Sequence, residues 1–265
     1  MLYFSVLGAL QISSDDEAVE IPGDLQRVLI QTLLVSEGRP IPAEALAEEM
    51  WGESAPDNQA NALQAHISRF RRRLRSLEPD RNPQRLVLRP SGYQLCVQKG
   101  ELDAVEFTDS VKSAEAMIGR NPAAAADILR RSMELWRGGV FGDLPAGSIC
   151  RLAAARYEAI RLRGMELLFD AELAIGRHDA ILVELAEAHM ANPLRERFCQ
   201  HLMVALYRAG RQAEALETYR SMWRRLSEEL GVQPSRELRG LENAILSHDT
   251  ALTASDGLAG AARSR

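Results

Sequence analysis

The sequence has 265 residues, of which 46% are hydrophobic and 26% are charged, so its length suits two domains and its composition can supply hydrophobic cores. Aromatic residues make up only 5%, while Ala, Leu, Arg and Glu are abundant, and this mixture favours helix over sheet. The net charge of −5 at pH 7 excludes a strongly basic protein, but not a local basic surface, because screening limits each charge to a range of roughly 10 Å.

The sequence shows no sign of a membrane or secreted protein. No run approaches the roughly 18 apolar residues that a membrane span needs, and the first residues lack the charged start and the cleavage site of a signal peptide. Cys96, Cys150 and Cys199 lie far apart and form no C-x-x-C pair. We therefore expect a cytoplasmic protein with reduced thiols and no membrane contact.

The first 56 residues alternate strand-like and helical patterns. Asp24 is expected to be the N-cap of the first helix, and Pro42 suits the first position of the second. The expected elements are, in chain order, a strand over residues 3–12, a turn at Asp15 and Asp16, a short strand over 18–21, a helix over 24–37 and a helix over 42–51.

A third helix is predicted over residues 57–77, and it carries the main functional signal. Its apolar residues recur at steps of three and four, which predicts one buried stripe made of Ala60, Leu63, Ile67, Phe70, Leu74 and Leu77. The opposite face is polar and rich in arginine. Residues 69–89 contain eight arginines, namely Arg69, Arg71, Arg72, Arg73, Arg75, Arg81, Arg85 and Arg89.

A β-hairpin is predicted directly behind this helix, with strands over residues 86–88 and 93–95 and a turn over 89–92. A helix with one apolar and one arginine-rich face can lie on a core and still fill a DNA major groove, while a hairpin tip reaches the adjacent minor groove. The residues expected at base edges or nearby phosphates are Asn61, Gln64, Ser68, Arg69 and Arg72. Those expected at phosphates are Arg71, Arg73 and Arg75, and those expected in the hairpin are Arg89, Ser91 and Tyr93.

A solvated helix face is the alternative interpretation of the arginines, because runs of charge are usually soluble surface. The two preceding helices and the following hairpin favour the DNA-binding interpretation over this one.

The chain after residue 102 is expected to be almost entirely helical. A short polar linker is predicted over residues 98–102, followed by about seven helices over 103–248 and a disordered tail over 249–265. Gly176 and Gly210 lie in similar turns 34 residues apart, which is the tetratricopeptide period, and Asn192-Pro193 separates them.

Several stretches of the chain carry a resemblance to a known family. They are residues 4–10, 50–52, 61–72 and 89–93 in the first half and 135–138, 176–178, 192–197, 206–216 and 229–234 in the second. With these stretches the order of the elements resembles an OmpR-type winged helix, and the whole chain resembles the Streptomyces antibiotic regulatory protein (SARP) family of transcriptional activators. The resemblance implies a mainly α fold with a small β part, in which a winged helix-turn-helix domain over 1–97 precedes an all-α, tetratricopeptide-like bacterial transcriptional activation domain over 103–248.

The resemblance also implies partners. Members of this family bind direct repeats upstream of antibiotic biosynthetic promoters and recruit RNA polymerase, so a homodimer on double-stranded DNA is expected. The implied polymerase contacts are the primary sigma factor and the C-terminal domain of the alpha subunit, with the beta subunits as a further candidate. The implied contact loop consists of Trp51, Gly52, Glu53, Ser54, Ala55 and Pro56.

No enzymatic chemistry is expected. His178, His189 and His201 lie on predicted helices without the spacing of metal ligands, and no G-x-x-x-x-G-K-[ST] loop for a nucleotide is present. We therefore expect no catalytic residue, no metal and no cofactor. Two alternatives remain open, namely a tetratricopeptide-like regulator that binds a ligand or protein, with DNA contact secondary, and a nucleic-acid hydrolase.

Overall fold

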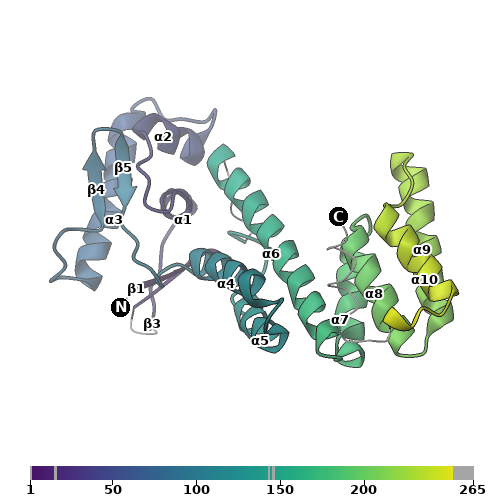
Figure 1. Cartoon of the computed structure of the whole chain (residues 1–265). Coiled ribbons are helices and arrows are strands. Elements are labelled where there is room, and N and C mark those ends of the chain that lie inside the picture. Colours follow the sequence, from purple (N-terminus) through teal and green to yellow (C-terminus); the bar gives the residue numbers. More distant parts are fainter. Residues whose placement is uncertain (1, 15–16, 143, 145–146, 253–265) are drawn as a thin grey trace. The chain divides into compact units, whose positions relative to one another are not determined.

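A computed structural model describes residues 2–14, 17–142, 144 and 147–252 (Figure 1). The chain folds into two compact units. Unit 1 consists of Met1–Ser110 with Arg131–Arg161, and unit 2 of Val111–Arg130 with Leu162–Arg265. The boundaries of these units differ from those of the predicted domains, which cover residues 1–97 and 103–248. The division into a DNA-binding domain and an activation domain therefore remains a proposal.

Unit 1 begins with a three-stranded antiparallel sheet in the order β1 (Leu2–Ser5), β2 (Gln11–Ser14) and β3 (Glu17–Ala18). The prediction of one strand over 3–12 is wrong, because the chain turns back between β1 and β2 around Gly8, whose φ is +145°. The short strand predicted over 18–21 ends at Ala18. The turn predicted at Asp15 and Asp16 lies outside the described residues.

Three helices follow the sheet, namely α1 (Asp24–Val35), α2 (Ala43–Trp51) and α3 (Gln59–Leu77). Asp24 is the first residue of α1 and not its N-cap, which is Gly23, and Pro42 precedes the helix that it was expected to begin. At the start of α3 the side chain of Asn58 accepts a hydrogen bond from the backbone N–H of Asn61 at 3.2 Å. A polar N-cap therefore fixes where α3 begins.

The predicted hairpin is present as β4 (Leu86–Arg89) and β5 (Gly92–Leu95), paired from Leu86–Leu95 to Arg89–Gly92. Strand β5 also pairs with the segment before α2, because Tyr93 and Ile41 exchange backbone hydrogen bonds of 2.8 and 2.9 Å. Gly92 has a φ of +130°, and a side chain there would overlap the backbone of Ile41. The hairpin is thus tied to the helices by its own backbone.

The described part of the chain after residue 102 contains seven α-helices, as the sequence predicts. They are α4 (Asp103–Met117), α5 (Pro122–Met133), α6 (Ser148–Ala174), α7 (His178–Ala191), α8 (Glu196–Arg208), α9 (Gln212–Arg225) and α10 (Arg236–Leu246). Gly176 and Gly210 have φ values of +79° and +75° in the turns before α7 and α9.

Two buried carboxylates join the segments of unit 1. Asp103, at the start of α4, accepts hydrogen bonds of 2.9 and 3.0 Å from the backbone N–H groups of Val6 and Leu7. Glu49 of α2 accepts bonds of 2.6 and 3.2 Å from the N–H groups of Ile149 and Cys150 at the start of α6. The first N–H groups of α6, which have no partner within the helix, are therefore satisfied by the carboxylate of Glu49, which the helix dipole also favours.

The predicted linker over residues 98–102 ends inside the core. Glu101 and Leu102 are each 1% exposed, and Leu102 forms a β-bridge with Phe4. The burial of these two residues could not be predicted, because Phe4 lies far away in the sequence, and the linker assignment itself stays a prediction.

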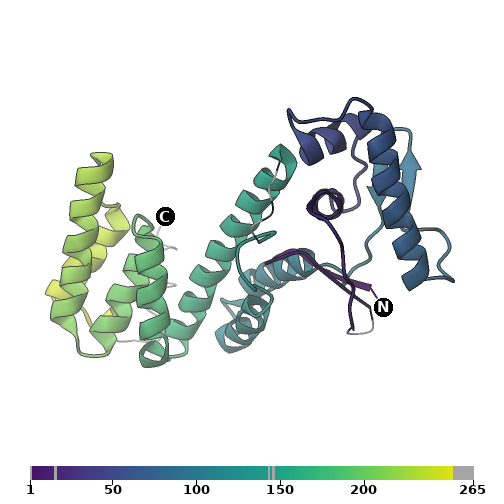
Figure 2. The ribbon, with the colours of Figure 1, turned by 180° about the vertical axis from the view of Figure 1, so that it is seen from behind.

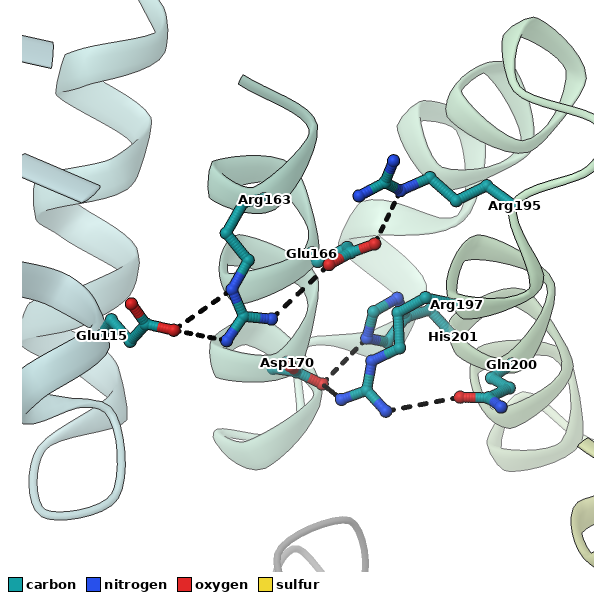
Figure 3. A network of polar contacts seen from close by, with 8 residues as sticks. All are labelled: Glu115, Arg163, Glu166, Asp170, Arg195, Arg197, Gln200 and His201. Atoms are coloured by element: carbon teal, nitrogen blue, oxygen red, sulfur yellow. Dashed lines mark hydrogen bonds and ion pairs between the residues drawn. The ribbon is translucent and has the colours of Figure 1, made fainter. Parts of the chain in front are cut away.

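Unit 2 combines an apolar core between α6 and α10 with a network of charges (Figure 3). In that network Asp170 accepts hydrogen bonds of 2.5 Å from Arg197 and 2.8 Å from His201. Of the tail predicted to be disordered, residues 250–252 form a short 3₁₀ turn, and residues 253–265 lie outside the described residues.

Candidate nucleic-acid interface

Helix α3 buries one face, as its periodicity predicts. Leu63, Ile67, Phe70 and Leu74 are at most 4% exposed. Ala60 is exposed, which corrects one end of the predicted stripe, and Leu77 is half-buried. The helix is therefore fixed on the core of unit 1 through its central turns.

The opposite face of α3 is polar and exposed. It carries six of the predicted contact residues, namely Asn61, Gln64, Ser68, Arg69, Arg72 and Arg73. In the described part of the chain no ion pair involves Arg69, Arg72 or Arg73. Guanidinium groups without a carboxylate partner repel one another, and they attract a polyanion such as a phosphate backbone.

Arg71 and Arg75 lie toward the hairpin. Arg71 is half-buried, and its Nε donates a hydrogen bond of 3.1 Å to the carbonyl oxygen of Leu86. Its guanidinium also lies 5.8 Å from the centre of the Tyr93 ring. Arg75 donates a 3.2 Å bond to Oε1 of Gln84. Arg71 therefore links α3 to the hairpin, which lies beside α3 in Figures 1 and 2, and Arg75 links α3 to the segment just before β4.

The hairpin presents two of its three predicted contact residues. Arg89 and Ser91 are exposed, and Nε of Arg89 donates a 2.8 Å bond to Oε1 of Gln94. Gln94 in turn donates a 2.6 Å bond to the carbonyl oxygen of Gly38. Tyr93 is different, because it is only 3% exposed and its ring belongs to the core.

Arg85 belongs to the basic block of the sequence but not to the exposed surface. It is 2% exposed and forms ion pairs with Glu78 and Glu101, the latter at 2.6 Å. Burial disfavours the charged guanidinium, but the bonds and charges of Glu101 and Glu78 outweigh this effect and raise the pKa of Arg85. No local pattern marks this triad, because Glu101 is 16 residues away.

The loop between α2 and α3 is a second exposed surface of unit 1. Trp51 is half-buried and packs edge-on against His66 of α3, with ring centres 6.2 Å apart. Burial and the charge of Arg69 lower the pKa of His66 below its ordinary value. Residues 52–56 are all exposed, so the loop projects from a helix end that Trp51 holds in place.

Comparison with known families and proteins agrees with this arrangement. Residues 102–246 match the family described as bacterial transcriptional activator domain, and residues 23–95 match the one described as transcriptional regulatory protein, C terminal. The chain belongs to the SARP family of transcriptional regulators.

Several relatives extend over nearly the whole chain. Transcriptional regulator RedD of Streptomyces coelicolor is 37% identical over 94% of this chain and 71% of its own length. Regulatory protein DnrI of Streptomyces peucetius is 31% identical over 94% of this chain and 93% of its own length. This chain spans only 25% of regulatory protein AfsR of Streptomyces coelicolor, with 37% identity.

A solved structure shows the same fold. It is Mycobacterium tuberculosis EmbR in complex with a low-affinity phosphopeptide, with a TM-score of 0.89 and 26% identity over 98% of this chain and 69% of that chain. The predicted fold class, a winged helix followed by a helical activation domain, is thereby confirmed.

The described residues lack two features that would indicate other kinds of protein. No helix among them is long and apolar enough to cross a membrane. They also contain no group of three or more His, Cys, Asp or Glu side chains that could hold a metal ion.

Proposed function

We propose that this regulator binds double-stranded DNA with the exposed face of α3 in the major groove and the Arg89 hairpin tip at the adjacent minor groove. One observation carries the proposal: arginines without acidic partners line the exposed face of a helix whose opposite face is locked into the core. Arginine can bond guanine at base edges, and arginines on the flanks neutralise phosphates, which position the helix without reading sequence.

Gel-shift titration of the full chain tests this proposal. Arg72→Ala and Arg89→Ala should each weaken binding by at least several-fold, because a phosphate or base contact is lost in each. Arg236→Ala is a matched control, since Arg236 is an exposed arginine at the start of α10. Unchanged affinity in both variants would rule the proposal out.

We further propose that the protein binds direct repeats as a homodimer and activates an antibiotic or secondary-metabolite gene cluster by recruiting RNA polymerase. The family membership supports this proposal, and so does the exposed loop over residues 52–56, which would meet the primary sigma factor or the alpha subunit. A Glu53→Lys variant should lose transcription from a reconstituted promoter while keeping its gel shift. A variant that activates normally would exclude the loop from this contact.

Removing everything after residue 100 is a poor test of activation. Residues 131–161 belong to unit 1, and Glu49 bonds the start of α6, so the truncation would expose part of the winged-helix core. Point substitutions keep that core intact and separate folding from function.

One observation favours the alternative of a partner-binding regulator. In unit 2 a groove of about 630 Å³ runs along α7, α8 and α9, and two exposed apolar residues, Val183 and Met190, line it. If this groove holds an apolar segment of a partner polypeptide, Val183→Asp should abolish activation and leave DNA affinity unchanged. Normal activation by that variant would exclude the alternative.

A further inference from the structure

Gln64 lies on the exposed face of α3, yet its side chain is held in place. Its Nε2 donates a 2.9 Å hydrogen bond to the hydroxyl of Tyr93 in β5. An exposed glutamine normally exchanges among several rotamers and loses that freedom when it binds a base. The bond to Tyr93 selects one arrangement before any DNA arrives.

Tyr93 is a rigid anchor for this bond. Its side chain is only 3% exposed, and its backbone is paired in both directions with Ile41. The guanidinium of Arg71 lies 5.8 Å from the ring centre, and Gly92 lets the two backbones approach. The position of the hydroxyl is therefore set by the core of unit 1 and not by the surface.

The bond leaves a defined pair of groups on Gln64. It uses one of the two amide hydrogens, so the second hydrogen and the acceptor Oε1 remain. In the major groove adenine offers an acceptor, N7, beside a donor, the N6 amino group. Guanine offers two acceptors at that edge, thymine one acceptor and cytosine one donor, so only adenine matches both groups of the amide.

We propose that Tyr93 is a positioning residue that fixes the amide of Gln64 to read adenine at one base pair. The inference rests on the proposed DNA-binding function. It adds the base that Gln64 recognises and the residue that positions Gln64 for this recognition. It also gives Tyr93 a role other than the direct DNA contact expected from the sequence.

The test begins with the full chain and a pool of randomised double-stranded oligonucleotides. The site that wild type selects is then varied one base pair at a time, and affinity is measured for all four choices. Wild type should prefer adenine at one position by roughly 5- to 100-fold, the usual value of a bidentate contact. Gln64→Ala should erase that preference.

Tyr93→Phe should reduce the same preference by roughly 2- to 10-fold, because a free amide loses more conformational entropy when it binds. Preferences at all other positions and the salt dependence should stay as in wild type. A merely structural role for the hydroxyl would instead weaken every site equally. Tyr207→Phe, in unit 2, is the matched control.

Gln64→Glu is a second variant that does not depend on how the hairpin folds, because Gln64 is an exposed residue of α3. A carboxylate only accepts, so the preference at that position should move from adenine to cytosine. If Tyr93→Phe keeps the full preference, or Gln64→Glu leaves adenine favoured, the inference is overturned while DNA binding stands. If wild type binds DNA but prefers adenine at no position, only the inference falls, whereas if it binds no oligonucleotide of the pool, the proposed function falls as well.

Discussion

The arginines of α3 and those of unit 2 are the same residue type in opposite settings. On α3, Arg69, Arg72 and Arg73 are exposed and have no ion pair among the described residues. In unit 2, many arginines are paired with a carboxylate, as with Arg163 and Glu115 at 2.5 Å and Arg197 and Asp170 at 2.5 Å (Figure 3).

This difference separates two uses of positive charge. The carboxylate beside a paired arginine neutralises its positive charge locally, and the pair supports the fold. A cluster of unpaired arginines retains a positive electrostatic potential that can attract a negatively charged partner. Arg85 is a third case, since it lies within the basic block of the sequence but is fully committed to two buried carboxylates. Counting arginines in a sequence therefore overstates a DNA-binding surface.

The largest effect is expected at Arg85. Arg85→Ala should destabilise unit 1 by about 3–5 kcal/mol, because it leaves the buried carboxylate of Glu101 without its partner. Urea unfolding followed by circular dichroism measures this loss. If the variant is as stable as wild type, Arg85 does not form the buried ion pairs described above and belongs with the surface arginines.

A smaller, pH-dependent effect is expected at Asp170. Burial alone would raise the pKa of this carboxyl, but the hydrogen bonds and charges of His201 and Arg197 lower it below its ordinary value. Asp170→Asn should cost about 1–3 kcal/mol at pH 7 through weaker hydrogen bonds.

The sign of the pH dependence follows from the lowered pKa. The stabilisation by Asp170 is complete above the unfolded pKa of about 3.9 and is lost as the pH falls through the lower folded value. The stability difference between wild type and Asp170→Asn should therefore shrink below about pH 4 in urea titrations. A difference that grows on acidification would show that the carboxylate is not stabilised as the structure indicates.

The smallest effect is expected at Arg163. Its pairs with Glu115 and Glu166 are partly exposed, so Arg163→Ala should change the free energy of unfolding by less than about 1 kcal/mol. DNA affinity should not change, in contrast to Arg72→Ala. A several-fold loss of affinity would place the DNA interface in unit 2 as well.

The elements with a strong local pattern could be predicted from the sequence. Helix α3 was expected over 57–77 and runs over Gln59–Leu77, because apolar positions at helical spacing indicate a helix, and four of the six predicted positions form its buried face. The hairpin followed from a turn sequence between two short apolar runs. The exposure of Asn61, Gln64 and Ser68 followed from the same helical period.

The remaining features depend on contacts distant in sequence. The strand expected over 3–12 is interrupted near Gly8, because β2 folds back and pairs with β1. The alternation of apolar and polar residues does not reveal where the chain turns back. The burial of Arg85 and Tyr93 depends on Glu101 and Ile41, which lie in other segments. The local sequence pattern predicts which face of a helix is exposed. Whether a polar residue near that face is available to bind DNA depends on contacts with residues that are distant in the sequence.

The salt dependence of DNA binding tests most directly whether the unpaired arginines form the interface. Removing three phosphate contacts should lower the slope of log affinity against log salt concentration by roughly 2–3, since each contact contributes about 0.9. We expect this change for Arg69→Ala, Arg72→Ala and Arg73→Ala combined, and none for a control that combines Arg163→Ala, Arg211→Ala and Arg220→Ala, each of which removes a paired arginine. Equal slopes for wild type and the α3 variant, or a reduced slope for the control, would show that the DNA-binding surface lies elsewhere.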